Sequence, residues 1–238
     1  EYCYETPMHG TVVVTSGIVT AVKPPSSEDG SHYPNFYLSQ PDADIWGGIY
    51  VFDTSVFPQL GDELTITATV NEYYSFTQLI DVNSFTTLPP GNSITPVSIS
   101  TGDLGIGCSF EGETLEGMLV KVSNITIENI DEYGAWTIND GSGDALVDDY
   151  FFDGDWPDVE LGDTFGSITG VVEYSYSEFK ILPRVVIDID ENECPVGSCL
   201  SADAICIYMG DLNNDGGWNV LDIVQLSNCI LSDNCDEN

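Results

Sequence analysis

Hydrophobic and polar residues alternate with a period of two over most of the first 190 residues of this chain. Such alternation predicts β-strands with one buried and one exposed face, because successive side chains of a strand point to opposite sides. The runs are rich in β-branched and aromatic residues and are separated by glycine, proline and aspartate. The clearest are Thr11–Val22, Asn35–Leu38, Gly48–Phe52 and Glu63–Val70. The pattern therefore predicts an all-β fold made of short strands.

The strand pattern occurs twice along the chain. Leu60-Gly61-Asp62, followed by Glu72-Tyr73, returns as Leu161-Gly162-Asp163, followed by Glu173-Tyr174. The loop at residues 23–33 is longer in the first copy, and the other corresponding segments are Asn35–Leu38 with Ala135–Ile138, and Gly10–Ile18 with Gly117–Ile125. Two homologous all-β domains explain this repeat. Five strands in roughly 70 to 75 residues is the size of a small Greek-key barrel of the OB type.

The order of these motifs carries a family resemblance. An aromatic-rich strand, a polar turn, Gly48–Phe52, Leu-Gly-Asp, a hydrophobic strand and Glu-Tyr follow one another. This order resembles the OB-like modules of secreted bacterial nucleases and multidomain surface proteins over residues 9–82 and 116–190. The resemblance implies a fold more than an activity, since OB-type barrels host unrelated functions.

The predicted architecture is all-β, with two tandem OB-like Greek-key barrels and a short C-terminal calcium loop and helix. The first barrel is assigned to residues 1–82 and the second to residues 116–190. A linker rich in proline and glycine, residues 83–115, lies between them, and a cysteine-rich tail, residues 191–238, follows.

A twelve-residue segment of the tail has the spacing of a calcium loop, with oxygen-bearing side chains at positions 1, 3, 5, 9 and 12 and glycine at position 6. Aspartate at position 12, in place of the usual glutamate, resembles the calcium repeat of type I dockerins. The following residues, Val220–Leu231, predict a helix with a broad apolar stripe. The alternative is a chance turn of Asp, Asn and Gly in an acidic chain. The predicted Ca²⁺ ligands are Asp211, Asn213, Asp215, the carbonyl of Gly217, Asn219 through a water, and Asp222.

The chain carries 40 acidic and four basic residues, a formal net charge of −36. Repulsion by this charge predicts that neither nucleic acid nor an anionic membrane is a partner. No run approaches the roughly 18 apolar residues of a membrane span, which predicts no membrane insertion. The start at Glu1 is interpreted as that of a mature chain whose signal peptide was removed. Acid-rich chains also occur in halophiles, so the charge by itself does not assign a calcium function.

Seven cysteines favour an oxidising compartment, and five of them fall in the last 45 residues. The predicted location is therefore extracellular or on the cell surface. Zinc binding through sulfur is the alternative, but no cysteine pair has the two-residue spacing of a zinc knuckle. The odd number leaves one thiol free or paired with another chain.

The chain is predicted not to be an enzyme. Neither of its two histidines, His9 and His32, lies near a motif of nucleophilic catalysis, and among 40 acids any chosen carboxylate pair is uninformative. Asn139–Asp144 predicts a hairpin turn, with a second cation site as the alternative. Several aromatic residues are typical of the stacking surfaces of OB folds, although packing is the favoured interpretation: Tyr37, Trp46, Tyr50, Tyr73, Tyr74, Tyr174 and Tyr176.

The favoured hypothesis is a secreted calcium-binding structural protein that self-assembles into a surface layer, tube or filament through its barrels and its tail. The lone dockerin-like repeat supports it, because its helix lacks the second repeat that would cover the apolar stripe. The first alternative is an extracellular glycan- or protein-binding module whose tail anchors it to a cohesin-like or surface partner. The second is an accessory part of a secreted nuclease.

Overall fold

The structure is a computed structural model that describes residues 3–23, 35–53, 55–88, 93–152 and 156–190. The chain divides into two units, Glu1–Glu193 and Cys194–Asn238. The second unit lies outside the described residues. The calcium loop predicted at Asp211–Asp222 and the helix predicted at Val220–Leu231 therefore stay predictions. Within the described ranges, no helix is long and apolar enough to cross a membrane.

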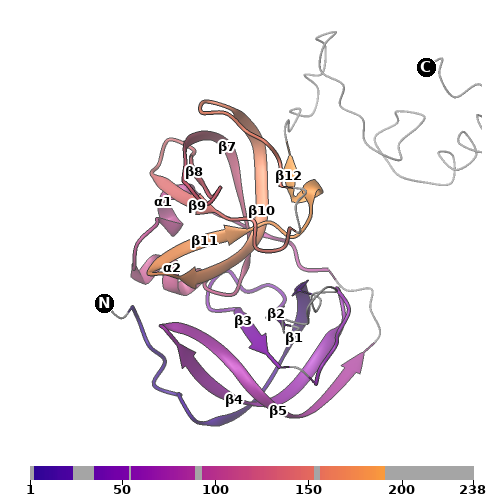
Figure 1. The fold of residues 1–238 in the computed structure, drawn as a ribbon. Helices are drawn as coiled ribbons and strands as arrows, with labels where there is room; N and C mark the ends of the chain where they lie inside the picture. Colours follow the sequence, from indigo (N-terminus) through magenta and orange to yellow (C-terminus); the bar gives the residue numbers. More distant parts are fainter. Residues whose placement is uncertain (1–2, 24–34, 54, 89–92, 153–155, 191–238) are drawn as a thin grey trace, which may run out of the picture. The chain divides into compact units, whose positions relative to one another are not determined.

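The first five strands close into a barrel whose order is β1-β2-β3-β5-β4, with β1 paired to β4 (Figure 1). All neighbours are antiparallel except β3 and β5, which are parallel. Alternate residues of β4, from Leu64 to Val70, are buried in the barrel core, as the period of two predicts. The strands are β1 (Val12–Lys23), β2 (Asn35–Ser39), β3 (Gly48–Phe52), β4 (Glu63–Tyr73) and β5 (Phe76–Leu88).

Five later strands form a second barrel, which β10 closes by pairing with β7. Two short strands extend its sheet: β6 (Val97–Ser98) pairs with β7, and β12 (Ile189–Asp190), which follows the 3-10 helix η1 (Val186–Asp188), pairs with β10. The strands of the barrel itself are β7 (Leu119–Ile130), β8 (Trp136–Asn139), β9 (Asp144–Val147), β10 (Thr164–Ser175) and β11 (Glu178–Leu182).

The two barrels share one topology. The order β7-β8-β9-β11-β10 matches β1-β2-β3-β5-β4 strand for strand, and the parallel pair β9 and β11 corresponds to β3 and β5. This match confirms the prediction of an all-β chain with two tandem OB-like barrels, each of five strands. It also explains the sequence repeat, because corresponding segments occupy corresponding strands.

The repeated Leu-Gly-Asp motif makes the same turn in both barrels. The Oδ2 atom of Asp62 accepts a hydrogen bond of 2.8 Å from the backbone N three residues before it, and so does Oδ2 of Asp163. The glycine before each aspartate has a positive φ, 83° and 91°, which favours glycine. Each turn also hydrogen-bonds the backbone of the first strand of its barrel, at Val19 and Ile127. The motif recurs because the turn needs both residue types.

The hairpin predicted at Asn139–Asp144 is confirmed, because β8 and β9 are antiparallel neighbours. Although burial raises the pKa of Asp140, hydrogen bonds from Ser142 and Thr101 outweigh it and hold the pKa at about 2. The Asp140 carboxylate therefore stabilises the turn between β8 and β9. Across the described ranges, no group of three or more His, Cys, Asp or Glu side chains is arranged to hold a metal ion, so the alternative of a cation site in this turn has no support.

Residues 83–115, predicted as a linker, contain the end of β5, strand β6 and two short helices, α1 (Thr101–Leu104) and α2 (Phe110–Leu115). The side chain of Ser109 caps α2 by accepting a hydrogen bond of 2.9 Å from the backbone N of Gly112. Directly before this cap, Cys108 forms a disulfide with Cys3. The disulfide ties α2 to the start of the chain.

The two barrels meet where two glycine backbones touch. A Cβ at Gly48 would lie 2.1 Å from the carbonyl carbon of Gly117, and a Cβ at Gly117 would lie 2.7 Å from the backbone N of Ile49. Both distances are far inside van der Waals contact, so glycine is required on both sides. Beside this contact the hydroxyl of Tyr37 donates to Oε2 of Glu173 across the junction, at 3.1 Å. Residues of both barrels form one hydrophobic cluster there.

Gly48→Ala should strongly destabilise the protein. The new methyl group has to displace the backbone of the other barrel, which costs more than ordinary overpacking, so we expect a loss of about 3 kcal/mol or more. Urea unfolding followed by circular dichroism measures this loss. Gly107→Ala is the matched control, because a Cβ at Gly107 meets nothing within 4 Å. Equal stabilities of the two variants would contradict the proposed junction contact.

Candidate functional site

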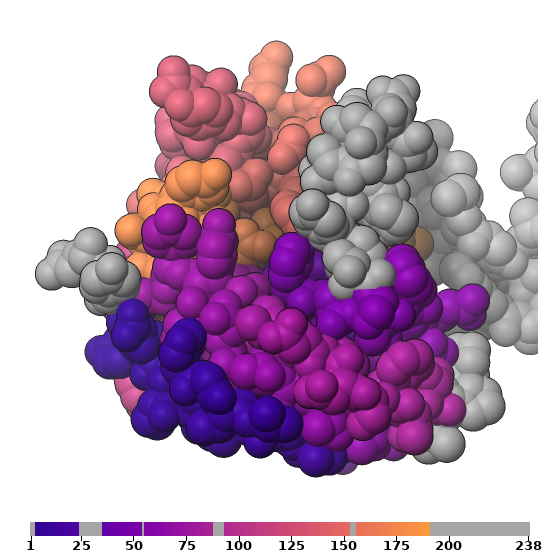
Figure 2. All heavy atoms as spheres, turned by 60° about the horizontal axis from the view of Figure 1, so that its bottom comes forward, coloured from indigo at the N-terminus to yellow at the C-terminus, as the bar shows by residue number. Residues whose placement is uncertain are grey.

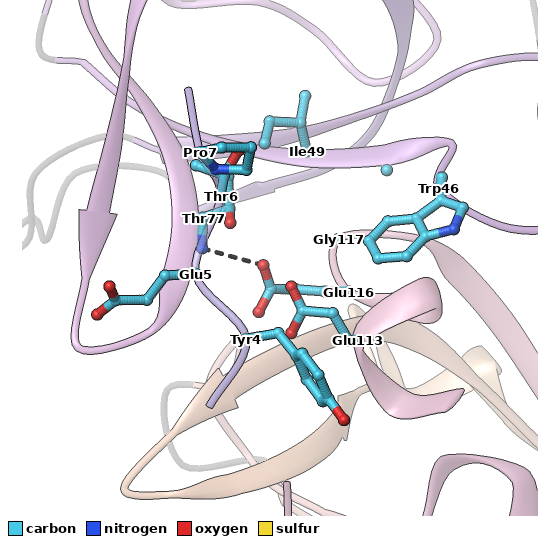
Figure 3. A pocket seen from close by; sticks show the side chains of 11 residues that line it. Tyr4, Glu5, Thr6, Pro7, Trp46, Ile49, Thr77, Glu113, Glu116 and Gly117 are labelled. Carbon is cyan, nitrogen blue, oxygen red and sulfur yellow. Dashed lines mark hydrogen bonds between the residues drawn. The ribbon is translucent and has the colours of Figure 1, made fainter. Parts of the chain in front are cut away.

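A cavity of about 400 Å³ opens beside the glycine contact. Four parts of the chain line it (Figure 3): the N-terminal segment, strand β3 with the residues before it, the start of β5, and helix α2 with the residues after it. Gly48 and Gly117 belong to this lining, so the junction of the barrels is also a wall of the cavity. The side chains on which its chemistry depends are Tyr4, Glu5, Trp46, Thr77, Glu113 and Glu116.

The N-terminal segment is held against the first barrel by several bonds. Cys3 is bonded to Cys108, and its backbone N donates to the hydroxyl of Ser75 at 3.0 Å. The backbone N of Thr6 donates to Oε1 of Glu72 at 2.8 Å. Figure 2 shows this segment, in indigo, lying along the purple surface of the first barrel. These attachments place Tyr4 at the edge of the cavity.

Helix α2 presents two glutamates three residues apart. Glu113 lies in its last turn, and Glu116 directly follows its end. Oε1 of Glu116 accepts a hydrogen bond of 3.0 Å from the backbone N of Thr77, so this carboxyl is anchored to β5 of the other barrel. Figure 3 shows both carboxyl groups pointing toward each other and into the cavity. The two barrels together therefore fix the position of Glu116.

Both carboxyl groups are largely withdrawn from water. The residues Glu113 and Glu116 are 7% and 9% exposed. Burial, together with the nearby charge of Glu72, raises the pKa of Glu113 to about 7. Burial also raises the pKa of Glu116 well above its usual value, and the charge of Glu113 adds to this effect. Oε2 of each residue is buried and has no hydrogen-bond partner among the described residues.

Three exposed aromatic rings stand beside these carboxyls. Tyr4, Trp46 and Phe110 are 48%, 55% and 54% exposed. The ring of Phe110 meets Tyr4 edge-on at 5.9 Å between centroids and Trp46 at 6.0 Å. Trp46 has a φ of 58°, which is strained for a bulky residue, and its backbone N donates to the carbonyl of Thr114 at 2.8 Å. The fold therefore holds a tryptophan at the mouth of the cavity at a cost to the backbone.

The aromatic residues singled out in the sequence do not form one surface. Tyr37, Tyr50 and Tyr174 are buried, which agrees with packing. Trp46 lies at the cavity, whereas the exposed tyrosines lie elsewhere: Tyr73, Tyr74 and Tyr176. The predicted calcium ligands, Asp211, Asn213, Asp215, Gly217, Asn219 and Asp222, lie outside the described residues, and calcium binding by them stays a prediction.

Sequence reasoning singled out Trp46 but missed the other five side chains of the site, Tyr4, Glu5, Thr77, Glu113 and Glu116. One signal for Glu113 and Glu116 is present, because they stand three residues apart and Glu116 is separated by a single glycine from the apolar run Met118–Val120. A carboxyl so close to a buried strand is a candidate for burial. Nothing local indicates Tyr4, since the disulfide that positions it joins cysteines 105 residues apart.

No family model and no curated protein matches the chain. Among solved structures, it resembles the tetrameric p202 HIN2 at 12% identity and a TM-score of 0.34, over 77% of this chain and 93% of that one. It resembles the p204 HINb domain at 12% identity and a TM-score of 0.36, over 74% of this chain and 95% of that one. It also resembles a murine DNA-binding protein bound with ds DNA, at 14% identity and a TM-score of 0.35, over 71% of this chain and 93% of that one.

These comparisons correct the predicted function and partners. The hypothesis of a secreted, calcium-binding, self-assembling protein, and its alternative of a module held by a cohesin-like or surface partner, are contradicted, since the similar structures are HIN domains and a DNA-binding protein. The exclusion of nucleic acid is contradicted too, because one of these structures is bound with ds DNA. That exclusion used the net charge of the whole chain, which does not describe any single face. None of the structures named here is a dockerin or a nuclease.

The matches have low identities and TM-scores, so they give this chain no function. The fold defines the class as a tandem OB-like barrel protein, and its function has to be argued from its own cavity.

The raised pKa of Glu113 predicts a pH dependence of stability. Its carboxyl binds a proton more tightly in the folded than in the unfolded chain, so stability should fall as pH rises from about 4.5 to about 7. Allowing for partial screening by water, we expect this carboxyl to account for a loss of about 2 kcal/mol. Urea unfolding at pH 5 and pH 8 measures the total loss.

Glu113→Gln should reduce that loss, because the amide does not ionise. Glu111→Gln is the matched control, since Glu111 is exposed on the same helix and its removal changes the net charge equally. If both variants lose stability between the two pH values as much as the unmodified protein does, Glu113 is not the group responsible.

Proposed function

We propose that this chain is a non-enzymatic binding protein and that the cavity at the barrel junction holds its ligand. One observation carries the proposal: Oε2 of Glu113 and Oε2 of Glu116 are buried in the cavity without hydrogen-bond partners among the described residues. A buried polar atom without a partner costs about 1–3 kcal/mol. A ligand that supplies hydrogen bonds or charge to both carboxyls would remove this cost.

The form of the cavity supports binding of a small organic ligand. Its volume of about 400 Å³ lies within the range of small-molecule sites, which is roughly 300–1,000 Å³. Such sites combine apolar and aromatic walls with a few convergent polar groups, and here Tyr4 and Trp46 stand beside two glutamates. The strained backbone of Trp46 further supports a functional role for that ring.

Binding accounts for these carboxyls better than catalysis does. A carboxyl pair that acts as acid and base needs one group neutral and the other ionised, so their surroundings move the two pKa values apart. Here burial raises the pKa of Glu113 and of Glu116 in the same direction. The residues that line the cavity also include no His, Cys, Ser or Lys to serve as nucleophile or base.

We further propose an oxidising, extracellular location. The disulfide between Cys3 and Cys108 supports this location, because disulfides persist in oxidising compartments. It also bears on the site, since it joins the segment that carries Tyr4 to the helix that carries Glu113. Reduction should therefore weaken ligand binding before it unfolds the barrels.

The binding proposal is tested with three probes of different chemistry: choline, myo-inositol and indole. We expect at least one to bind with a Kd of about 1 mM or tighter, measured by isothermal titration calorimetry. Trp46→Ala should weaken that binding at least about tenfold, because the ring forms part of the cavity.

Tyr176→Ala is the control for this substitution, since Tyr176 is 91% exposed and does not line the cavity. Failure of all three probes to bind, or equal binding by the two variants, would contradict the proposal.

A further inference from the structure

We propose that the cavity recognises an organic ammonium group, either a protonated amine or a quaternary ammonium. This proposal deepens the proposed function and rests on it. It names the chemical class of the ligand. Two carboxyls and two aromatic rings that line one cavity favour this class.

The charges around the cavity favour a cation. Three acidic residues line it, Glu5, Glu113 and Glu116, and the lining includes no basic residue. The nearby Glu72 already uses its Oε1 to accept hydrogen bonds from Thr6 N and Thr77 Oγ1, both at 2.8 Å. Its Oε2, like Oε2 of Glu113 and Oε2 of Glu116, is buried without a hydrogen-bond partner among the described residues. Only Glu113 and Glu116 line the cavity, so their Oε2 atoms are the acceptors that a ligand there would meet. A protonated amine would donate charge-assisted hydrogen bonds to these oxygens, whereas a quaternary ammonium would compensate the buried negative charge by ion pairing alone.

The aromatic rings distinguish an organic cation from a metal ion. Ammonium groups are attracted to the faces of Trp and Tyr rings within about 6 Å of the centroid. Figure 3 shows the two carboxyls side by side near Thr77, with the rings of Tyr4 and Trp46 on two other sides of them, and all four residues line the cavity. Within the described part of the chain, no three His, Cys, Asp or Glu side chains are placed so that they could hold a metal ion, and this includes the three glutamates of the cavity. A cation with apolar substituents fits these walls better than a hydrated ion does.

The site also has a built-in dependence on pH. Burial first, and the charge of Glu72 second, raise the pKa of Glu113 to about 7, so its carboxyl holds a proton in mildly acidic solution. An ammonium group pairs with the ionised carboxylate and has to displace this proton. Below about pH 7 the ionised fraction falls tenfold per unit, so the Kd should rise by about tenfold per unit if one proton is displaced. Glu116 faces the same carboxyl, and burial first and the charge of Glu113 second raise its pKa too, so the Kd should level off only when both carboxyls are ionised.

A pair of probes that differ only in charge tests the proposal. Choline carries a quaternary nitrogen, and 3,3-dimethylbutan-1-ol is its neutral isostere with carbon in place of nitrogen. At pH 8 we expect choline to bind at least about tenfold more tightly than the alcohol, because only choline has a positive charge that pairs with the carboxylates and is attracted to the ring faces. Titrations of the full chain in about 0.15 M NaCl screen general attraction to its acidic surface.

Matched variants test whether the two carboxyls cause the difference in affinity between choline and the alcohol. Glu113→Gln should bring the Kd of choline close to that of the alcohol and remove most of the dependence on pH. Glu111→Gln, on the exposed side of the same helix, should leave both unchanged. Thermal unfolding without ligand verifies that each variant is folded, and Glu116→Gln gives a second test at the neighbouring carboxyl.

The outcomes distinguish the ammonium proposal from the broader proposal that the cavity binds a small organic ligand. Equal affinity for choline and the alcohol, or a choline Kd that does not change between pH 5 and pH 8, overturns the ammonium proposal. If myo-inositol or indole then binds and Trp46→Ala weakens that binding, the cavity remains a binding site for another class of ligand. If no probe binds at all, both proposals fail.

Discussion

The contact between Gly48 and Gly117 is the constraint on which the rest of the structure depends. It brings the backbones of two barrels closer than any side chain allows. Gly117 lies between the end of α2 and the start of β7, and Gly48 is the first residue of β3, so the contact also sets where helix α2 lies against the first barrel. The hydrogen bond from Thr77 to Glu116 depends on that placement. The cavity needs residues from both barrels, so it can form only if the barrels are held in one relative arrangement. The two glycines make this arrangement possible because they let the two backbones approach closely.

The same junction explains why carboxyl groups are buried in so acidic a chain. A chain with 40 acidic residues gains solubility from those that face water, but each carboxyl that becomes buried loses hydration. Glu113 and Glu116 lie where α2 is pressed between the barrels, and the pKa of each rises in consequence. The Cys3–Cys108 disulfide adds the N-terminal segment as a further wall. The burial of these two carboxyl groups therefore follows from the way the barrels meet.

The sequence predicted the barrels well and the site poorly, for a physical reason. Strand periodicity and the Leu-Gly-Asp turn are local, since the side chain of Asp62 bonds a backbone N only three residues away. A repeat then reveals two copies of one topology. The site is assembled from distant parts: Tyr4 is placed by a disulfide to Cys108, and Glu116 by a bond to Thr77 of the other barrel. Trp46 could be named as a candidate because it is aromatic, but no local pattern indicates which rings are exposed.

The junction contains a third buried carboxyl, and its surroundings separate a structural role from a binding role. Glu173 of β10 lies at the interface, and burial raises its pKa as well. Its Oε2, however, accepts a hydrogen bond from the hydroxyl of Tyr37, so the other barrel satisfies it from within the protein. Oε2 of Glu113 and Oε2 of Glu116 have no such bond, although they lie at the same junction. Because the chain supplies a partner to Oε2 of Glu173 and none among the described residues to Oε2 of the two glutamates that line the cavity, this pair is the part of the interface that a ligand would complete.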